Sequence, residues 1–208
     1  MIKNIVFDLG NVVVFFDKDF VISPFTKDPT EINFLKTQVI GCPEWSKIDA
    51  GACTEEQMYD SFKTRMTEKQ LKLAADFSHN WYRKGRPLNK GAVRIAHQLK
   101  KMGYHLFVLS NISINCFEYL KSENKDFFDL FEGLIISGYE KVKKPDPKIF
   151  EILLKRFNLD PTETLLIDDD DTGSTFKTAN SMGIKGKAVE RNNEQSIVEL
   201  LKQNGIEV

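Results

Sequence analysis

Three aspartates of the sequence stand directly after short apolar segments, where a carboxylate can take part in chemistry. Asp8 follows the segment 5–7, and Asp168 and Asp169 follow the segment 164–167. Carboxylates that are brought together repel one another unless a cation lies between them. Carboxylate and carbonyl oxygens, together with water, are the ligands that suit Mg²⁺. The three aspartates therefore predict a Mg²⁺ site, provided that the two segments lie side by side.

Two further apolar segments are followed by groups that can bind a phosphoryl group. Ser110 and Asn111 follow the segment 105–109, and Lys144 comes shortly after the segment 133–136. A hydroxyl and an amide bind phosphoryl oxygens without adding charge, whereas a lysine neutralises the phosphoryl group and an attacking carboxylate. Together with the aspartates, these residues predict phosphoryl transfer that depends on positioning and electrostatic stabilisation.

The four apolar segments have the character of strands that are buried on both faces, because they are short and continuous rather than alternating. Helical patterns separate or follow them, at residues 89–102, 147–157, 174–182 and 194–204. The segment 185–189 is a weaker fifth strand. Strands that alternate with helices predict an α/β fold with a doubly wound parallel sheet. In such a sheet ligands bind at the carboxyl ends of the strands, so the polar residues are expected to meet at one edge.

Residues 18–85 interrupt this alternation. They contain three amphipathic segments with helical spacing, namely 30–40, 54–66 and 68–82. The second of these opens with Thr54-Glu55-Glu56-Gln57, the pattern of a capping box. A helical insertion after the first strand is expected to form a lobe above the carboxyl end of that strand. We therefore predict a core domain of residues 1–17 and 86–208 and a helical cap domain of residues 18–85.

The composition is typical of a soluble globular protein. Of 208 residues, 41% are hydrophobic and 28% are charged, and the net charge of −1 produces no strong field that would attract nucleic acid or an anionic membrane. The apolar run before Asp8 is too short for a signal peptide, and no stretch approaches the about 20 apolar residues of a membrane helix. Three scattered cysteines, Cys42, Cys53 and Cys116, lack zinc-binding spacing and favour a reducing compartment. We expect a cytoplasmic protein with no nucleic-acid or membrane partner, of undetermined oligomeric state.

The chain resembles the haloacid dehalogenase superfamily, whose motifs its polar residues match in order. The first motif is an apolar strand that ends in Asp8, and the second is Ser110 after a strand. The third is Lys144 before a helix, and the fourth is a strand that ends in the paired acids Asp168 and Asp169. The resemblance covers the chain from end to end and implies the core fold of that superfamily.

One branch of the superfamily is most similar. The run Asp8-Leu9-Gly10-Asn11-Val12 resembles the sugar-phosphate phosphatase branch typified by bacterial α-D-glucose-1-phosphate phosphatase, and residues 18–85 resemble the small helical cap of that family. The resemblance implies a Mg²⁺-dependent hydrolase of a small phosphorylated metabolite, with sugar phosphates favoured.

The resemblance also implies a role for each motif residue. Asp8 would be the nucleophile, forming an aspartyl-phosphate, and would also bind the metal ion. The main-chain carbonyl of Gly10 and the side chain of Asp169 would complete the protein ligands, with Asp168 orienting water or ligand behind them. The phosphoryl group would be held by Ser110, the backbone of Asn111 and Lys144.

Two positions depart from the family pattern. Most phosphatases of the family carry a general acid, an aspartate, two residues after the nucleophile, where this chain has Gly10. The missing acid costs about 10²–10⁴ in rate unless the leaving group is good or another acid replaces it. Asp17 is a candidate for this acid, and its alternative role is that of a turn or hinge residue.

The fourth motif is the second departure. Counting from the end of the strand selects Asp168 and Asp169 as the paired acids, whereas counting back from the end of the following helix favours Asp170 and Asp171. We prefer the first pair, because strand ends fix ligands more rigidly than loops do.

Other activities are compatible with parts of the pattern. Carbon–halogen hydrolysis uses the same nucleophile but needs no metal, so the acidic fourth motif argues against it. A phosphomutase needs a proton donor, which Gly10 disfavours. A phosphate-binding protein without turnover is supported by Gly10 alone. In the cap, Trp45 either packs in the interior or faces the sugar.

Overall fold

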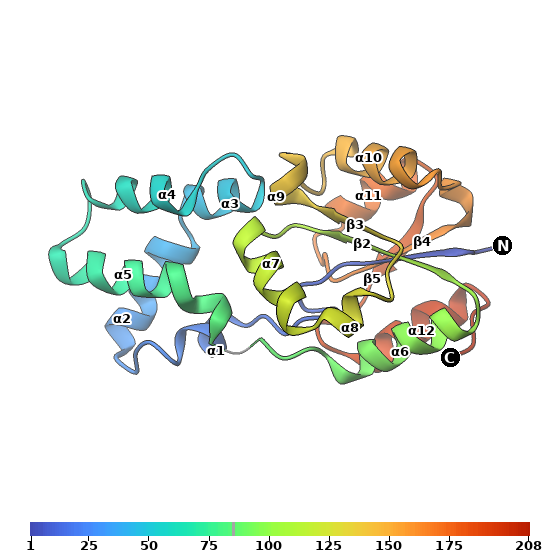
Figure 1. Cartoon of the computed structure of the whole chain (residues 1–208), viewed down its shortest axis with the longest axis horizontal. Coiled ribbons are helices and arrows are strands. Elements are labelled where there is room, and N and C mark those ends of the chain that lie inside the picture. Colours follow the sequence, from blue (N-terminus) through green and yellow to red (C-terminus); the bar gives the residue numbers. More distant parts are fainter. Residues whose placement is uncertain (85) are drawn as a thin grey trace.

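The computed structural model describes residues 1–84 and 86–208, which form a five-stranded α/β core and a lobe of helices beside it (Figure 1). All strands are parallel, in the order β3-β2-β1-β4-β5. Their bounds are β1 Asn4–Phe7, β2 His105–Ser110, β3 Gly133–Ile136, β4 Thr164–Asp168 and β5 Lys185–Ala188. The predicted doubly wound parallel sheet is confirmed. The predicted end of the cap at residue 85 lies outside the described residues.

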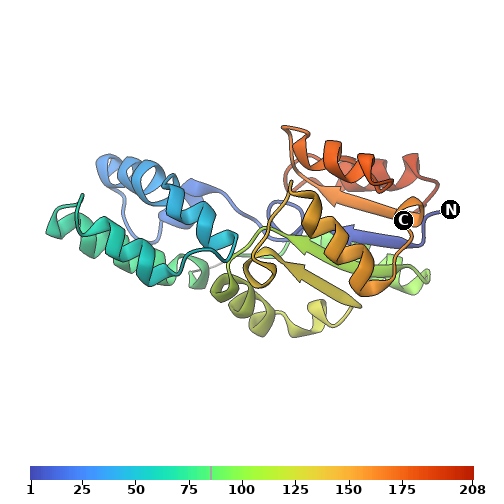
Figure 2. The ribbon, with the colours of Figure 1, turned by 90° about the horizontal axis from the view of Figure 1, so that it is seen from above.

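Helices cover both faces of the sheet (Figures 1 and 2). One face carries α6 (Lys90–Lys101), α7 (Ile114–Glu123), α8 (Lys125–Phe128) and α12 (Glu194–Gln203), and the other carries α10 (Pro147–Phe157) and α11 (Ser174–Ser181). Successive side chains of a strand point to opposite faces. Accordingly, Ile5 and Phe7 of β1 pack into the first layer and Val6 into the second.

The lobe of residues 18–83 has its own hydrophobic core, in which Leu35, Phe62 and Phe77 are fully buried. Its helices are α1 (Lys18–Ile22), α2 (Pro29–Phe34), α3 (Pro43–Asp49), α4 (Glu55–Phe62) and α5 (Glu68–Asn80), with a π-helical turn at Leu35–Ile40 and a 3₁₀ turn at Trp81–Arg83. Capping boxes open α4 at Thr54, as predicted, and α5 at Thr67.

The predicted helical segment 30–40 is helical throughout, as an α-helix to Phe34 and as a π-helix from Leu35 to Ile40. The predicted segment 54–66 is too long, because its helix ends at Phe62. Thr67 then caps the next helix with an extended backbone (φ −71°, ψ 162°), so a continuous helix through this region is excluded.

The register of the sheet brings the polar strand ends together. Phe7 of β1 pairs with Val108 of β2 and with Ile167 of β4, so Asp8 and Asp168 are adjacent at the carboxyl edge. The cap lies at this edge, and both chain termini lie at the opposite end of the molecule (Figure 1). The topology thus creates a site between the sheet and the cap.

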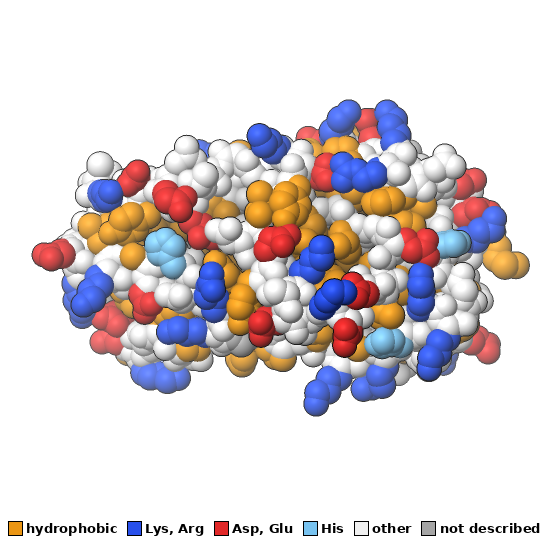
Figure 3. Space-filling view, in the orientation of Figure 1, with side chains coloured by type: hydrophobic (Ala, Val, Ile, Leu, Met, Phe, Trp, Pro, Cys, Tyr) orange, Lys and Arg blue, Asp and Glu red, His pale blue; other side chains and the backbone are white. Residues whose placement is uncertain are grey.

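The surface carries charges of both signs. On the face shown in Figure 3, basic and acidic side chains are interspersed over the cap and the core. Among the residues that the structure describes, no helix has the length and apolar character needed to cross a membrane.

Candidate active site

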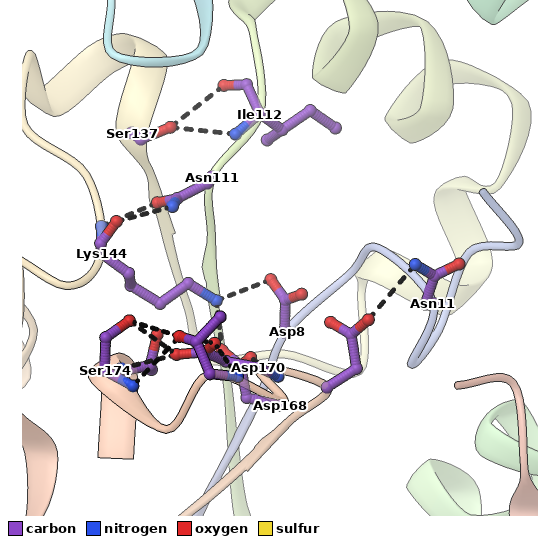
Figure 4. A network of polar contacts seen from close by, with 12 residues as sticks. Asp8, Asn11, Asn111, Ile112, Ser137, Lys144, Asp168, Asp170 and Ser174 are labelled. Carbon is purple, nitrogen blue, oxygen red and sulfur yellow. Dashed lines mark hydrogen bonds and ion pairs between the residues drawn. The ribbon is translucent and has the colours of Figure 1, made fainter. Parts of the chain in front are cut away.

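Lys144 lies between two aspartates at the carboxyl edge of the sheet (Figure 4). Its Nζ donates hydrogen bonds to Asp8 Oδ1 at 2.8 Å and to Asp168 Oδ2 at 2.5 Å. All three side chains are buried, with exposed fractions of 7% for Asp8, 6% for Lys144 and 3% for Asp168. The predicted nucleophile and the predicted lysine are therefore in direct contact.

Asp169, the first residue after β4, lies close to these groups. One oxygen from each of Asp8, Asp168 and Asp169 lies within 4.8 Å of the other two. Asp169 Oδ2 accepts a hydrogen bond from Asn11 Nδ2 at 3.2 Å and pairs with Arg191 Nε at 3.1 Å. The predicted triad of acids thus forms one cluster.

The cluster has an excess of negative charge. Three carboxylates face one buried ammonium group, and the guanidinium of Arg191 is mostly exposed. Burial and, to a smaller extent, the charge of Asp168 raise the pKa of Asp8 to about 6, against the attraction of Lys144. Burial alone would lower the pKa of Lys144, but the carboxylates of Asp8 and Asp168 raise it above its ordinary value. One ammonium group does not balance the acids, so the set of oxygen donors suits a divalent cation.

Asn111 fixes the backbone of Lys144. Asn111 Oδ1 accepts a hydrogen bond from the Lys144 amide at 2.8 Å, and Asn111 Nδ2 donates one to the Lys144 carbonyl at 2.9 Å (Figure 4). This pair of bonds ties the loop before α10 to the end of β2. Ser110, the last residue of β2, is 2% exposed, and its side chain acts to lower the pKa of Asp8 against the effect of burial. Ser110 and Asn111, two of the three predicted phosphoryl-binding residues, are therefore linked to Asp8 and Lys144 of the acidic cluster.

Asp170, the alternative metal ligand, is occupied in its own loop. Its Oδ1 accepts hydrogen bonds from the amide and the hydroxyl of Thr172, and its Oδ2 accepts from the Ser174 hydroxyl and the Thr175 amide. Although partial burial would raise the pKa of Asp170, these hydrogen bonds lower it well below its usual range. The Thr175 amide belongs to the first turn of α11, so Asp170 serves as a cap for that helix.

Replacing Asp170 with alanine is expected to lower the free energy of unfolding by about 1–2 kcal/mol, because the first turn of α11 loses its acceptor. Urea denaturation measures this change. Asp171→Ala is the control: Asp171 is exposed and has a 3.4 Å contact with Arg191, so a change within about 0.5 kcal/mol is expected. Unchanged stability of Asp170→Ala, combined with lost Mg²⁺ affinity, would show instead that Asp170 is a ligand.

A small cavity lies over the strand ends and below the cap. It has a volume of about 120 Å³ and is lined from the core by Gly10, Ser110, Asn111 and Ile112. The cap contributes Trp45, Asp49 and Trp81, and the segments that join it to the core contribute Phe16 and Arg86. A larger, open hollow of about 750 Å³ lies between α5 and α7, and none of the motif residues lines it. Of these two hollows, only the small cavity is lined by motif residues.

Aromatic rings and one arginine form the cap side of this cavity. Trp45 packs against Phe77 in the cap interior and against Trp81, so it combines the two alternative positions considered for it. The Arg86 guanidinium lies 5.0 Å from the ring centre of Trp81, and its Nη1 donates to Cys116 Sγ at 2.8 Å. Within the described part of the chain, the buried Nε of Arg86 has no hydrogen-bond partner.

Asp17, the candidate substitute acid, does not line this cavity. It is exposed, and its Oδ1 accepts a hydrogen bond from the Phe20 amide at 2.9 Å, which makes it the N-cap of α1. Asp17 therefore lies at the turn where the chain enters the cap, as in the alternative role considered for it.

Sequence reasoning missed two groups of residues at the site. Arg191 follows β5 as the other site residues follow their strands, so the same rule applied to the weak fifth strand would have found it. Asp49 and Arg86 come from outside the strand ends, and only the docking of the cap reveals them.

The chain is similar to known proteins of one family. The model of the family described as haloacid dehalogenase-like hydrolase matches residues 2–176. A D-ribitol-5-phosphate phosphatase of Bacteroides thetaiotaomicron is 29% identical over 180 residues, which cover 81% of this chain and 84% of that protein. A glyceraldehyde 3-phosphate phosphatase of Pyrococcus abyssi is 38% identical over 79 residues, or 38% of this chain and 33% of that protein.

Solved structures share the fold. A haloacid dehalogenase family enzyme from Bacteroides thetaiotaomicron, in complex with magnesium and inorganic phosphate, matches with a TM-score of 0.70 and 22% identity, over 93% of this chain and 96% of that one. The L-2-haloacid dehalogenase of Xanthobacter autotrophicus matches with a TM-score of 0.65 and 21% identity, over 98% and 83% of the two chains. With most of its length matched by the family model, and with the motif residues gathered at one edge of the sheet, the chain belongs to the haloacid dehalogenase-like hydrolases.

Proposed function

We propose that the protein is a Mg²⁺-dependent phosphatase that hydrolyses a small phosphorylated metabolite through an aspartyl-phosphate on Asp8. The observation that carries this proposal is the cluster of three carboxylates beside the buried ammonium group of Lys144. Relatives named as phosphatases of ribitol 5-phosphate and glyceraldehyde 3-phosphate support the reaction class and favour sugar phosphates.

The metal ion would be held by Asp8, Asp169 and the main-chain carbonyl of Gly10, with Asp168 behind them. It would supply positive charge to the phosphoryl oxygens and to the excess of carboxylates. The buried position of Asp168, bonded to Lys144 and to the Asp170 amide at 2.9 Å, suits a supporting role.

The chain's own residues would carry the reaction in two steps. In the first, a carboxylate oxygen of Asp8 forms a bond to phosphorus as the ester bond breaks, and the alcohol leaves. In the second, water attacks the phosphorus of the aspartyl-phosphate and releases phosphate and Asp8. Ser110, Asn111 and Lys144 would hold the phosphoryl oxygens during both steps, and the buried site would exclude bulk water.

The cavity supports a small, polar substrate. Its volume of about 120 Å³ admits a compact group, and its lining combines aromatic faces with the charged side chains of Asp49 and Arg86. Aromatic faces with hydrogen-bonding groups beside them can bind the hydroxyl-bearing carbon chain of a sugar phosphate.

A screen of phosphate release tests this function. We expect Mg²⁺-dependent release from several sugar and polyol phosphates, and loss of release when EDTA removes the metal. Chloride release from 2-chloropropionate that survives EDTA would identify a dehalogenase instead. Metal-dependent binding of phosphorylated ligands without release across the panel would identify a binding protein.

A further inference from the structure

The cap places a carboxyl group in the cavity above the acidic cluster. Asp49, the last residue of α3, lines the same cavity as Gly10 and Ser110. It approaches this cavity from the cap, whereas Asp8 approaches the site from the core. A substrate bound between the lobes would have its phosphoryl group toward Asp8 and its remaining part toward Asp49.

The backbone at Asp49 is held by the core. The Ser137 hydroxyl donates a hydrogen bond to the Asp49 carbonyl and accepts one from the Ile112 amide at 2.9 Å. One hydroxyl therefore links Asp49 to the segment that follows Ser110 and Asn111. Two residues later, Gly51 has φ +63° and lies so close to Gly138 that an added Cβ would be 2.2 Å from the Gly138 carbonyl oxygen. This contact fixes the end of α3 against the core.

The surroundings of Asp49 favour a protonated carboxyl group. Burial raises the pKa of Asp49 to about 7, although the positive charges of Lys143 and Arg86 and a hydrogen bond from the Ser113 amide oppose the rise. A carboxyl group with this pKa is partly protonated at neutral pH and can donate a proton.

The other titratable groups around Asp49 do not offset this effect. Glu55 of α4 lines the neighbouring small cavity with Asp49 and is itself subject to a raised pKa through burial. The Cys116 thiol of α7 has its pKa raised to about 11 by burial, so it is neutral at pH 7. On α9 (Ser137–Glu140), which packs against α3, Glu140 is paired with Arg156.

The reaction needs such a donor. Position 10 is glycine, and Asp17 is exposed and engaged in capping α1. An alkoxide is a poor leaving group, so cleavage of an alkyl phosphate is slow unless the ester oxygen receives a proton.

We propose that Asp49 is the general acid of the reaction, which donates its proton from the cap to the leaving oxygen of the substrate. This inference rests on the proposed phosphatase function. As the bond from Asp8 to phosphorus forms, the ester bond breaks, its electron pair stays on the ester oxygen, and that oxygen takes the proton of Asp49. In the second step, the water that attacks the aspartyl-phosphate gives a proton back to the Asp49 carboxylate. Each turnover thus restores the protonated acid.

The leaving group separates proton donation from binding. 4-Nitrophenolate leaves readily without a proton, whereas a primary alkoxide does not. The value of kcat/KM reports the steps up to loss of the alcohol, so it isolates the first transfer. We expect Asp49→Asn to lower kcat/KM by about 10²–10⁴ for the primary alkyl phosphate that the wild type hydrolyses fastest, and by less than about threefold for 4-nitrophenyl phosphate. Asp17→Asn is the matched control and should leave both values unchanged.

Two further measurements keep the test decisive. Asp49→Glu retains a carboxyl group, so its ratio of alkyl to aryl kcat/KM should lie between those of the wild type and Asp49→Asn. In the wild type, the same ratio should fall as the pH rises above about 7, because Asp49 loses its proton there. Equal losses on both substrates in Asp49→Asn, or a wild-type ratio that is constant between pH 6 and 9, would overturn the role of Asp49 while leaving the phosphatase function intact. A wild type that releases no phosphate from any ester would overturn both.

Discussion

Replacing Asp8 with asparagine is expected to lower phosphate release at least about 10⁴-fold, because the amide oxygen cannot serve as the nucleophile. The fold should survive, since Lys144 keeps its ion pair with Asp168 and one of three mutually repelling carboxylates is removed. Steady-state phosphate release measures the activity, and circular dichroism with thermal melting measures the fold.

Asp17→Asn is the matched control for this variant. It makes the same chemical change at an exposed aspartate, and asparagine also serves as an N-cap, so activity and stability should stay close to those of the wild type. A folded Asp8→Asn protein that retains more than a tenth of the wild-type rate would contradict the role of Asp8.

Replacing Lys144 with methionine should produce the second-largest effect, because it removes the only buried positive charge between Asp8 and Asp168 among the described residues. We expect kcat/KM to fall about 10³-fold through lost stabilisation of the phosphoryl oxygens. Without metal, the free energy of unfolding should fall by about 3–5 kcal/mol, because two buried carboxylates lose their partner. Phosphate release and urea denaturation, each with and without Mg²⁺, measure the two effects.

Mg²⁺ should recover part of the stability of Lys144→Met, since the cation offsets the same carboxylates. Lys155→Met, which changes an exposed lysine on α10, provides the control and should alter neither quantity appreciably. Unaltered stability of the metal-free Lys144→Met protein would show that the ion pairs of Lys144 do not balance the buried acids.

The sequence predicted the parallel sheet and the meeting of its polar strand ends because both depend on local patterns. Short apolar segments ended in polar residues, and the parallel register alone then brings Asp8 beside Asp168. The ambiguity between Asp169 and Asp170 could not be resolved at that level. It depends on hydrogen bonds within the loop, where Asp170 caps α11 and Asp169 faces Asn11.

The contribution of the cap could not be predicted for a different reason. The sequence identified the helices of the cap, but Asp49 reaches the cavity because Gly51 packs against Gly138 and Ser137 bonds to the Asp49 carbonyl. Such contacts join segments that are about 90 residues apart, and no periodicity or motif spacing encodes them. Asp17 was nearer to the nucleophile in sequence, yet its side chain satisfies the first turn of α1.

Trapping the covalent intermediate tests the central claim most directly. Enzyme in excess is mixed with Mg²⁺ and an intact sugar phosphate that the wild type is known to hydrolyse. The mixture is quenched in acid within milliseconds, and the protein is digested and analysed by mass spectrometry. We predict that the peptide containing Asp8 carries one added phosphoryl group, and that this peptide is unmodified in Asp8→Asn. A phosphoryl group on a different residue, or product formation at the wild-type rate by Asp8→Asn, would contradict attack by Asp8.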